Sequence, residues 1–337
     1  MGVMTQRDLS GDASHLSSEP PVSIIVTVRN EERFLEAAIS AALHSEYSGE
    51  KELIVAVGPS TDRTEAIARR IADQDSRVKV VLNPSGRTPD GLNAALNQTQ
   101  NEIIVRIDGH SEISKTYIRD AVKALMQSGA VNVGGVMAAE GISPFERSVA
   151  RAMRSRIGVG SSRFHTGGEA GSVDTVYLGV FRKDALLKAG GYDSRFTRAQ
   201  DWELNYRLRK NGGIIWFDPK LSVTYRPRNS ISSLARQYFE YGRWRRAVSR
   251  THRGTSNFRY LAPPLNLALQ LSSISAGLLI SPIFFIPSGT YAIVLLVASI
   301  LLGKTWAERL FLPFVLITMH FSWGFGFITS PRTLLSK

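Results

Sequence analysis

Four side chains in this sequence have the type and spacing needed to bind and activate a charged substrate. Asp108 ends the mostly apolar run Ile103–Ile107, and His110 follows it two residues later. A carboxylate and an imidazole so close together at the end of a strand can chelate one divalent ion. Asp62 follows another apolar run, and it either joins the same site or simply begins a helix. Asp201 lies at the start of a predicted helix, where a carboxylate can act as a general base.

The elements that must position these residues alternate between strands and helices. In residues 21–120, short runs rich in β-branched residues alternate with helical patterns of apolar residues. This alternation predicts βαβ units and a mostly parallel sheet, in which ligands bind at the carboxyl ends of the strands. Residues 121–228 are richer in glycine and arginine, and their predicted strands are less regular. In the first half the predicted strands are 22–28, 52–57, 78–82 and 102–107, and the predicted helices are 31–43, 64–73 and 89–98.

The composition excludes several classes of protein. The chain has 337 residues, 43% of them hydrophobic, which suits one large α/β domain with an appendage. It has no cysteine, so disulfides and thiolate metal sites are excluded. No G-x-G-x-x-G motif follows the first predicted strand, which argues against a dehydrogenase. The net charge of +12 does not indicate nucleic-acid binding, because the arginines gather before the apolar C-terminal segment and no nucleic-acid recognition motif is visible.

The C-terminal segment, residues 261–337, is predicted to be a membrane domain. Its apolar stretches are 265–286, 291–303 and 310–329, of which the first and third are long enough to span a bilayer and the second is short. Two or three transmembrane helices are therefore expected. Residues 229–260 are predicted to form a basic amphipathic helix and linker that lie on the membrane surface. By the positive-inside rule these arginines predict that the large N-terminal domain is cytoplasmic, so we expect a multi-pass protein of the cytoplasmic (inner) membrane.

Six sequence motifs occur in order between Pro21 and Arg250. They are VSIIVTVRNEERFLEAAISAAL, GPSTDRT, VLNPSGRTPDGLNAAL, RIDGHSEISKTYI, GGYDSRFTRAQDWELNYRLRKNGG and RQYFEYGRW. Together they resemble the family-2 glycosyltransferases of GT-A fold, and within them the ExoA-type enzymes of exopolysaccharide (succinoglycan) biosynthesis. The resemblance implies a Rossmann-like α/β domain over residues 21–228, with a nucleotide-binding half, 21–120, and an acceptor half, 121–228. Residues 1–20 are polar and predicted to be disordered.

The resemblance implies a role for each matching residue. Asp201 would be the catalytic base, and Asp108 with His110 would hold Mg²⁺ or Mn²⁺ on the diphosphate of the donor. Asp62 would bind the uracil ring of a UDP-sugar. The other donor contacts would come from Thr27, Arg29, Glu31, Arg87 and Asp108. Contacts to the acceptor and the diphosphate would come from Gln237, Arg243 and Trp244.

Several further residues need an interpretation of their own. Trp202, beside the proposed base, either stacks on a sugar of the acceptor or packs in the interior. Asp174, before a predicted strand, is a candidate contact for the acceptor. His165 lies in a glycine-rich stretch, where a solvated loop histidine is expected more than a lid residue near the phosphates. Glu203 is expected to orient its neighbours or pair with an arginine, because residues two apart on a helix do not face each other.

The predicted chemistry is the transfer of a sugar from a nucleotide-diphosphate donor to a polyprenyl-linked or polysaccharide acceptor at the membrane. A divalent ion would neutralise charge on the leaving diphosphate, and a base would deprotonate the attacking hydroxyl. One base opposite the leaving group predicts a single in-line displacement with inversion at the anomeric carbon. Two alternatives stay open. One is a non-catalytic membrane protein that binds nucleotide-sugar or glycan, and the other is a processive polysaccharide synthase, which would need a channel.

Overall fold

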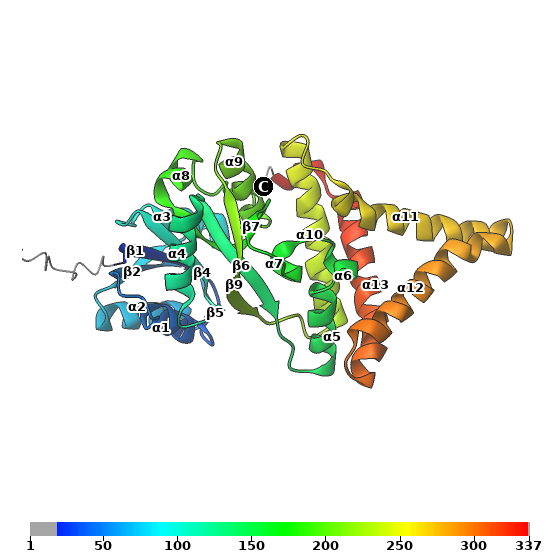
Figure 1. Cartoon of the computed structure of the whole chain (residues 1–337), viewed down its shortest axis with the longest axis horizontal. Helices are drawn as coiled ribbons and strands as arrows, with labels where there is room; N and C mark the ends of the chain where they lie inside the picture. Colours follow the sequence, from blue (N-terminus) through cyan, green and yellow to red (C-terminus); the bar gives the residue numbers. More distant parts are fainter. Residues whose placement is uncertain (1–18, 336–337) are drawn as a thin grey trace, which may run out of the picture.

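The structure is a computed structural model that describes residues 19–335 (Figure 1). The segment predicted to be a disordered N-terminus, residues 1–20, therefore lies almost entirely outside the described residues. The described chain consists of an α/β domain built on one sheet and a helical C-terminal part that lies beside it.

The sheet has a parallel half, as the sequence predicts, and a mixed half. The parallel strands lie in the order β3 (Val78–Leu82), β2 (Lys51–Val57), β1 (Val22–Val28) and β4 (Ile103–Asp108). The mixed half continues with β8 (Tyr177–Arg182), β6 (Asn132–Ala139), β9 (Ile215–Tyr225) and β5 (Glu112–Ile113), and β7 (Gly171–Ser172) pairs with β9. It is mixed because β8 runs antiparallel to both β4 and β6, whereas β6 and β9 are parallel.

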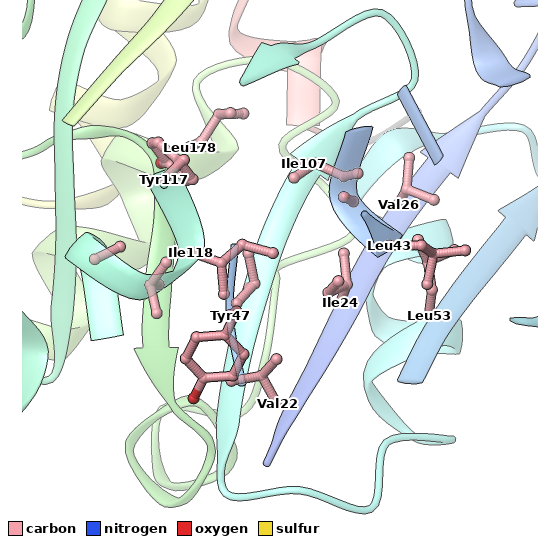
Figure 2. Packing of buried hydrophobic residues seen from close by; sticks show 14 of the residues in the cluster. Val22, Ile24, Val26, Leu43, Tyr47, Leu53, Ile107, Tyr117, Ile118 and Leu178 are labelled. Atoms are coloured by element: carbon pink, nitrogen blue, oxygen red, sulfur yellow. The ribbon is translucent and has the colours of Figure 1, made fainter. Parts of the chain in front are cut away.

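Helices cover both faces of the sheet, and strand residues alternate between two cores. Residues of α1 (Leu35–Leu43), α2 (Thr64–Gln74) and α4 (Tyr117–Ser128) pack in the first core. Residues of α3 (Thr88–Leu96), α8 (Lys183–Lys188) and α9 (Gln200–Lys210) pack in the second. Ile24 and Val26 of β1 belong to the first core together with Ile107 of β4 (Figure 2), and Ile25 belongs to the second. Burial on both faces explains why β1 is almost continuously apolar.

The remaining helices form the second part of the molecule. After β6 come α5 (Pro144–Met153), α6 (Arg156–Val159) and α7 (Arg163–Thr166). The C-terminal part contains α10 (Ile231–Thr251), α11 (Phe258–Leu279), η1 (Pro282–Phe285), α12 (Ile286–Leu302), α13 (Trp306–Thr329) and η2 (Arg332–Leu335). In Figure 1, α11 and α12 form an arm that extends away from the α/β domain, and α13 returns beside α10.

Two described helical stretches are long and apolar enough to cross a membrane, by length and composition: Pro282–Leu302 and Trp306–Thr329. The sequence prediction treated 265–286 as a full span and 291–303 as a short one, whereas by this test the middle stretch qualifies and α11 does not. The 3₁₀ helix η1 runs directly into α12 and lengthens the middle stretch. Most of the first stretch belongs to α11, which contains Asn266, Gln270 and several serines, and its last residues belong to η1 and the start of α12.

Helix α10 packs along α13, with close approaches at two glycines. A Cβ atom at Gly242 of α10 would lie 2.1 Å from the backbone oxygen of Trp323, and one at Gly326 of α13 would lie 2.0 Å from that of Phe239. The apolar residues of α10 also reach the α/β domain, where Trp244 joins a cluster with Phe196. The predicted surface helix is thus held between two parts of the protein, so much of its apolar face is covered by protein.

The glycine contact between α10 and α13 predicts the effect of adding one methyl group. Gly242→Ala would force the two helices apart and destabilise the protein by about 1–3 kcal/mol, because overpacked contacts must move backbone atoms. We expect the melting temperature of the detergent-solubilised protein to fall by several degrees. Gly289→Ala in α12 is the matched control, since nothing lies within 4 Å of its Cβ position. Equal melting temperatures for Gly242→Ala and the wild type would contradict the packing described here.

Candidate active site

The carboxyl ends of β1, β2 and β4 meet at one edge of the sheet. Asp108 is the last residue of β4, and the sheet register pairs it with Thr27 of β1. Asp62 follows the end of β2, which pairs with β1 on the other side. Because these strands are parallel, the loops that follow them lie side by side. The fold therefore brings Thr27, Asp62 and Asp108 to one edge, although the first and last of them are 81 positions apart in the sequence.

A buried guanidinium joins this edge to the distant Asp201. Arg106 of β4 is 2% exposed, and its Nη2 donates to Oδ1 of Asp108 at 3.1 Å. Its Nη1 donates to Oδ1 of Asp201, in the first turn of α9. Sequence reasoning missed Arg106. The signal was a charged residue inside an otherwise apolar strand, two positions before Asp108 and therefore on the same face of the sheet.

The charges of this group are strongly coupled. Burial raises the pKa of Asp201 above its usual value, and Asp108 adds to that effect while Arg106 opposes it. Burial also opposes the charge on Arg106, but Asp201 and Asp108 outweigh it and raise the pKa of the guanidinium well above its usual value. Arg106 therefore stays charged. A carboxyl group with a raised pKa is a better proton acceptor than an ordinary aspartate once it is ionised.

Three tyrosines surround Arg106 and Asp108. The Arg106 guanidinium lies 5.9 Å from the ring centroid of Tyr192, and the hydroxyls of Tyr117 and Tyr192 are buried without a hydrogen-bond partner in the described chain. Burial raises the pKa of these two phenols and of Tyr177 well above the usual value. The hydroxyls therefore stay protonated.

The contacts of the His110 imidazole bear on the predicted metal site of His110 and Asp108. Nδ1 of His110 lies 2.9 Å from Oε1 of Glu31, and this hydrogen bond raises the pKa of His110. A carboxylate that accepts from one ring nitrogen leaves the other free to bind a metal. No group of three or more metal-binding side chains occurs among residues 19–335, so diphosphate oxygens and water would complete the shell, as is usual for Mg²⁺. Glu31, expected at the nucleotide, thus contacts the candidate metal ligand.

Asp62 holds two loops together. Its Oδ1 accepts hydrogen bonds from the backbone nitrogen of Thr64 at 3.0 Å and from Oγ1 of Thr64 at 2.6 Å, and its Oδ2 accepts from the nitrogen of Glu32 at 3.2 Å. The hydrogen bond from the Thr64 hydroxyl lowers the pKa of this carboxyl. Asp62 therefore holds the start of helix α2, which is one of the two roles that the sequence left open. A contact with a nucleobase stays a prediction.

The other predicted donor residues lie at the end of β1 and on the loops after β1 and β3. Helix α3 lies directly against Thr27, because a Cβ at Gly91 would come 2.1 Å from its Oγ1. Arg29 lies next to Gly86, whose Cβ position is 3.4 Å from Nη1 of the arginine. The neighbouring Arg87 donates from Nε to Asp90 at 2.8 Å. Arg29 and Arg87 thus flank the same loop.

The predicted acceptor residues of α10 have contacts inside the protein. Gln237 donates to the hydroxyls of Tyr225 at 2.7 Å and Tyr241 at 2.9 Å. Both Arg243 and Trp244 donate to Glu240, at 2.8 Å and 3.1 Å. Trp244 also packs against Phe196, in the segment that leads to Asp201, with ring centroids 6.4 Å apart. Through this contact, α10 supports the position of Asp201.

Trp202 and Asp174, the other acceptor candidates, also have partners. The Arg245 guanidinium lies 3.7 Å from the Trp202 ring centroid, and the Tyr206 ring stacks on Trp202 at 5.8 Å. This arrangement favours the packing interpretation of Trp202. Asp174 pairs with Arg209 at 3.3 Å.

The predictions for Glu203 and His165 can be compared directly with the structure. Glu203 pairs with Arg207 at 2.7 Å and contacts His252 at 3.0 Å, which confirms its predicted pairing with arginine. The expectation of a solvated His165 was wrong, because the residue lies in the short helix α7 with Nδ1 sealed from solvent. Burial lowers the pKa of His165 to about 3, so the imidazole is neutral.

Comparison with known proteins identifies relatives of the chain. The model of the family "Glycosyl transferase family 2" matches residues 23–190. The chain is 30% identical over 311 residues to the succinoglycan biosynthesis protein ExoA of Rhizobium meliloti, which covers 90% of this chain and 93% of the relative. It is 24% identical to the dolichyl N-acetyl-alpha-D-glucosaminyl phosphate 3-beta-D-2,3-diacetamido-2,3-dideoxy-beta-D-glucuronosyltransferase of Methanococcus voltae, over 91% of this chain and 95% of that relative. The solved structure of mannosyltransferase PcManGT from Pyrobaculum calidifontis, in complex with GDP-Man and Mn²⁺, shares the fold with a TM-score of 0.62 at 19% identity, covering 90% of this chain and 86% of that one.

The position of Arg106 between two carboxylates predicts that replacing it lowers the free energy of unfolding, and that a second substitution at Asp201 recovers part of the loss. Arg106→Gln leaves both carboxylates without their cation and should destabilise the protein by about 3 kcal/mol, as for a broken buried ion pair. Adding Asp201→Asn should recover part of this loss, because it removes one unpaired charge. The measurement is denaturant unfolding of the single and double variants. Arg77→Gln, which breaks the exposed pair with Asp75, is the control and should cost less than about 1 kcal/mol.

Proposed function

Because the chain belongs to glycosyl transferase family 2, with a GT-A-like fold, it is a glycosyltransferase of polysaccharide or lipid-linked glycan biosynthesis, and we propose that it transfers one sugar from a UDP-sugar to a lipid-linked acceptor with inversion. The observation that carries the proposal is the buried Arg106, which holds Asp201 next to Asp108 at the carboxyl edge of the sheet. A donor diphosphate and an attacking hydroxyl would meet at that edge.

The donor side of the proposal uses the loops after β1, β2 and β3. Asp62 is fixed and charged, so one of its oxygens can accept from a uracil ring. Thr27 lies near the end of β1, and Arg29 and Arg87 lie on the neighbouring loops, where guanidinium groups suit a diphosphate.

A divalent ion would be held by Asp108 and His110, with Glu31 orienting the imidazole. When bound, Mg²⁺ or Mn²⁺ supplies positive charge to the leaving diphosphate. The related mannosyltransferase structure holds Mn²⁺ together with its donor, which supports a metal in this chain.

The proposed base is Asp201. The acceptor hydroxyl forms the new bond to the anomeric carbon and loses its proton to Asp201, while the bond from that carbon to the diphosphate breaks. Glu203 is committed to Arg207 and His252, so it is not available as a second catalytic carboxylate. A single carboxylate therefore favours one displacement and inversion rather than a covalent intermediate.

The acceptor is proposed to be carried by a lipid. The relative from Methanococcus voltae is named for action on a dolichyl phosphate sugar, and two described helical stretches of this chain are apolar enough to enter a membrane. Arginines such as Arg246, Arg250 and Arg253 precede these stretches, which favours a catalytic domain on the cytoplasmic face. A non-catalytic binding protein would have no use for the buried charges around Asp201.

Replacing the base tests the proposed reaction. Asp201→Asn should lower the rate of sugar transfer by about 10²–10⁴-fold, the usual worth of a general base, while UDP still binds. Asp193→Asn is a matched control in the same segment, because the Asp193 carboxylate contacts the side chain and the backbone nitrogen of Arg195. The assay is transfer from a panel of UDP- and GDP-sugars to polyprenyl-linked saccharides by the purified protein in detergent. Undiminished transfer by Asp201→Asn would overturn the assignment.

Metal removal tests the role of Asp108 and His110. EDTA should abolish transfer, and Mg²⁺ or Mn²⁺ should restore it. Glu31→Gln, which weakens the support of His110, should raise the metal concentration for half-maximal rate by about 10–100-fold. Glu36→Gln is the control, because Glu36 forms an exposed pair with Arg70. Full activity in EDTA would remove the metal from the proposal.

A further inference from the structure

A second charged site lies apart from the edge that carries Asp108. A cavity of about 410 Å³ opens between α7, the start of the segment before β8, α9 and α11. Three arginines line it, Arg163, Arg209 and Arg259, and the acidic residue in its wall is Asp174. Asp174 pairs with only one of these arginines, Arg209, at 3.3 Å. The cavity therefore has an excess of positive charge.

A fourth arginine lies beside this cavity. Arg245 of α10 is 4% exposed, and its guanidinium is stacked between the rings of Trp202 at 3.7 Å and Tyr260 at 3.6 Å. Burial lowers the pKa of Arg245 to about 10, with Arg259 and Arg209 lowering it further and Asp174 raising it. The charge of Arg245 is thus close enough to interact electrostatically with the charged residues that line the cavity.

Several polar atoms of this region have no partner among the described residues. They are Nε of Arg209, a residue that lines the cavity, and Nε and Nη1 of Arg245 beside it. Buried donors without an acceptor cost about 1–3 kcal/mol each, and like charges held close together add to that cost. An anion with several oxygens bound to Arg163, Arg209 and Arg259 would offset the repulsion among these charges, because a guanidinium binds phosphate through two parallel hydrogen bonds.

The place of the cavity connects it to both the proposed base and the membrane helices. Helix α9 carries Asp201 in its first turn and Arg209 two turns later, about 12 Å along the axis. Trp202, next to Asp201, lies under Arg245. On the other side, Arg259 belongs to the first turn of α11, which leads into the apolar stretch Pro282–Leu302.

We propose that this cavity binds the phosphate or diphosphate group that joins the acceptor's sugar to its lipid, so that a short saccharide extends along α9 from Arg209 to Asp201. The inference rests on the proposed function, in which the acceptor is lipid-linked. The donor diphosphate is held elsewhere, at the strand edge near Asp108, so the two phosphate sites are separate. The lipid then follows α11 toward the membrane.

Binding of farnesyl diphosphate, a lipid diphosphate without a sugar, tests the site independently of catalysis. The full chain in neutral detergent is titrated by calorimetry without divalent metal, in the presence and absence of UDP. Arg209→Gln and Arg163→Gln should each weaken binding about tenfold or more, since each removes a charge-assisted contact. Asp174→Asn should strengthen binding, which separates a loss of charge from misfolding. Displacement of farnesyl diphosphate by UDP would overturn the proposal.

Two controls identify the source of the phosphate. Arg154→Gln removes an exposed arginine of similar charge outside this cavity, and it should leave binding unchanged. Equal weakening by Arg154→Gln and Arg209→Gln would mean non-specific attraction and would overturn the site. Competition by phosphatidylglycerol in mixed micelles would assign the cavity to a phospholipid headgroup instead, which also overturns the proposal.

Transfer kinetics distinguish this inference from the proposed function. Arg209→Gln should raise KM for a polyprenyl-diphosphate-linked saccharide about tenfold or more, and leave KM for the donor and for the same saccharide without phosphate unchanged. Absence of any transfer by the wild type would overturn the proposed function, while the binding result would still stand. Wild-type transfer with an unchanged acceptor KM in Arg209→Gln would overturn only the phosphate site.

Discussion

The arrangement of the site depends on the buried guanidinium of Arg106. It contacts both Asp108, at the end of a central strand, and Asp201, at the start of a helix in the other half of the domain. Two carboxylates this close would repel each other without a cation between them. The same pairing keeps Asp201 ionisable despite its burial, because the charge on Arg106 opposes the effect of desolvation on its pKa.

The C-terminal helices also support this group. Trp244 of α10 packs against Phe196, in the segment before Asp201, and His252 contacts Glu203 of α9. The end of the described chain returns to the same place, where Leu334 packs in that cluster. The C-terminal helical part, which contains the two stretches long and apolar enough to cross a membrane, is thus joined by direct contacts to the helix of the proposed base. Movement of these helices would shift the position of Asp201. The C-terminal helices therefore have a physical role in supporting the proposed base, in addition to attaching the protein.

Much of the fold could be predicted from the sequence, because its signals are local. The parallel strands and their helices follow from short apolar runs, and their observed bounds differ from prediction by a few residues. The family also follows from motifs in order along the chain. The assignment of spans differed from the structure where η1 joins α12, because a hydropathy pattern does not show where one helix continues into another. The burial of His165 was missed because glycine-rich flanks suggest a solvated loop.

By itself, the sequence determined the βαβ half, the acidic residues at its strand ends and the family to which the chain belongs. These properties depend on residues close together in the chain or on motifs read in order. Only the tertiary structure decided which residues share a site. It brought Arg106 to Asp201 across 95 positions, placed Glu31 against His110, and gathered the four arginines beside α9 from separate elements. Contacts between side chains from distant segments arise from packing of the whole domain, and no local pattern contains them.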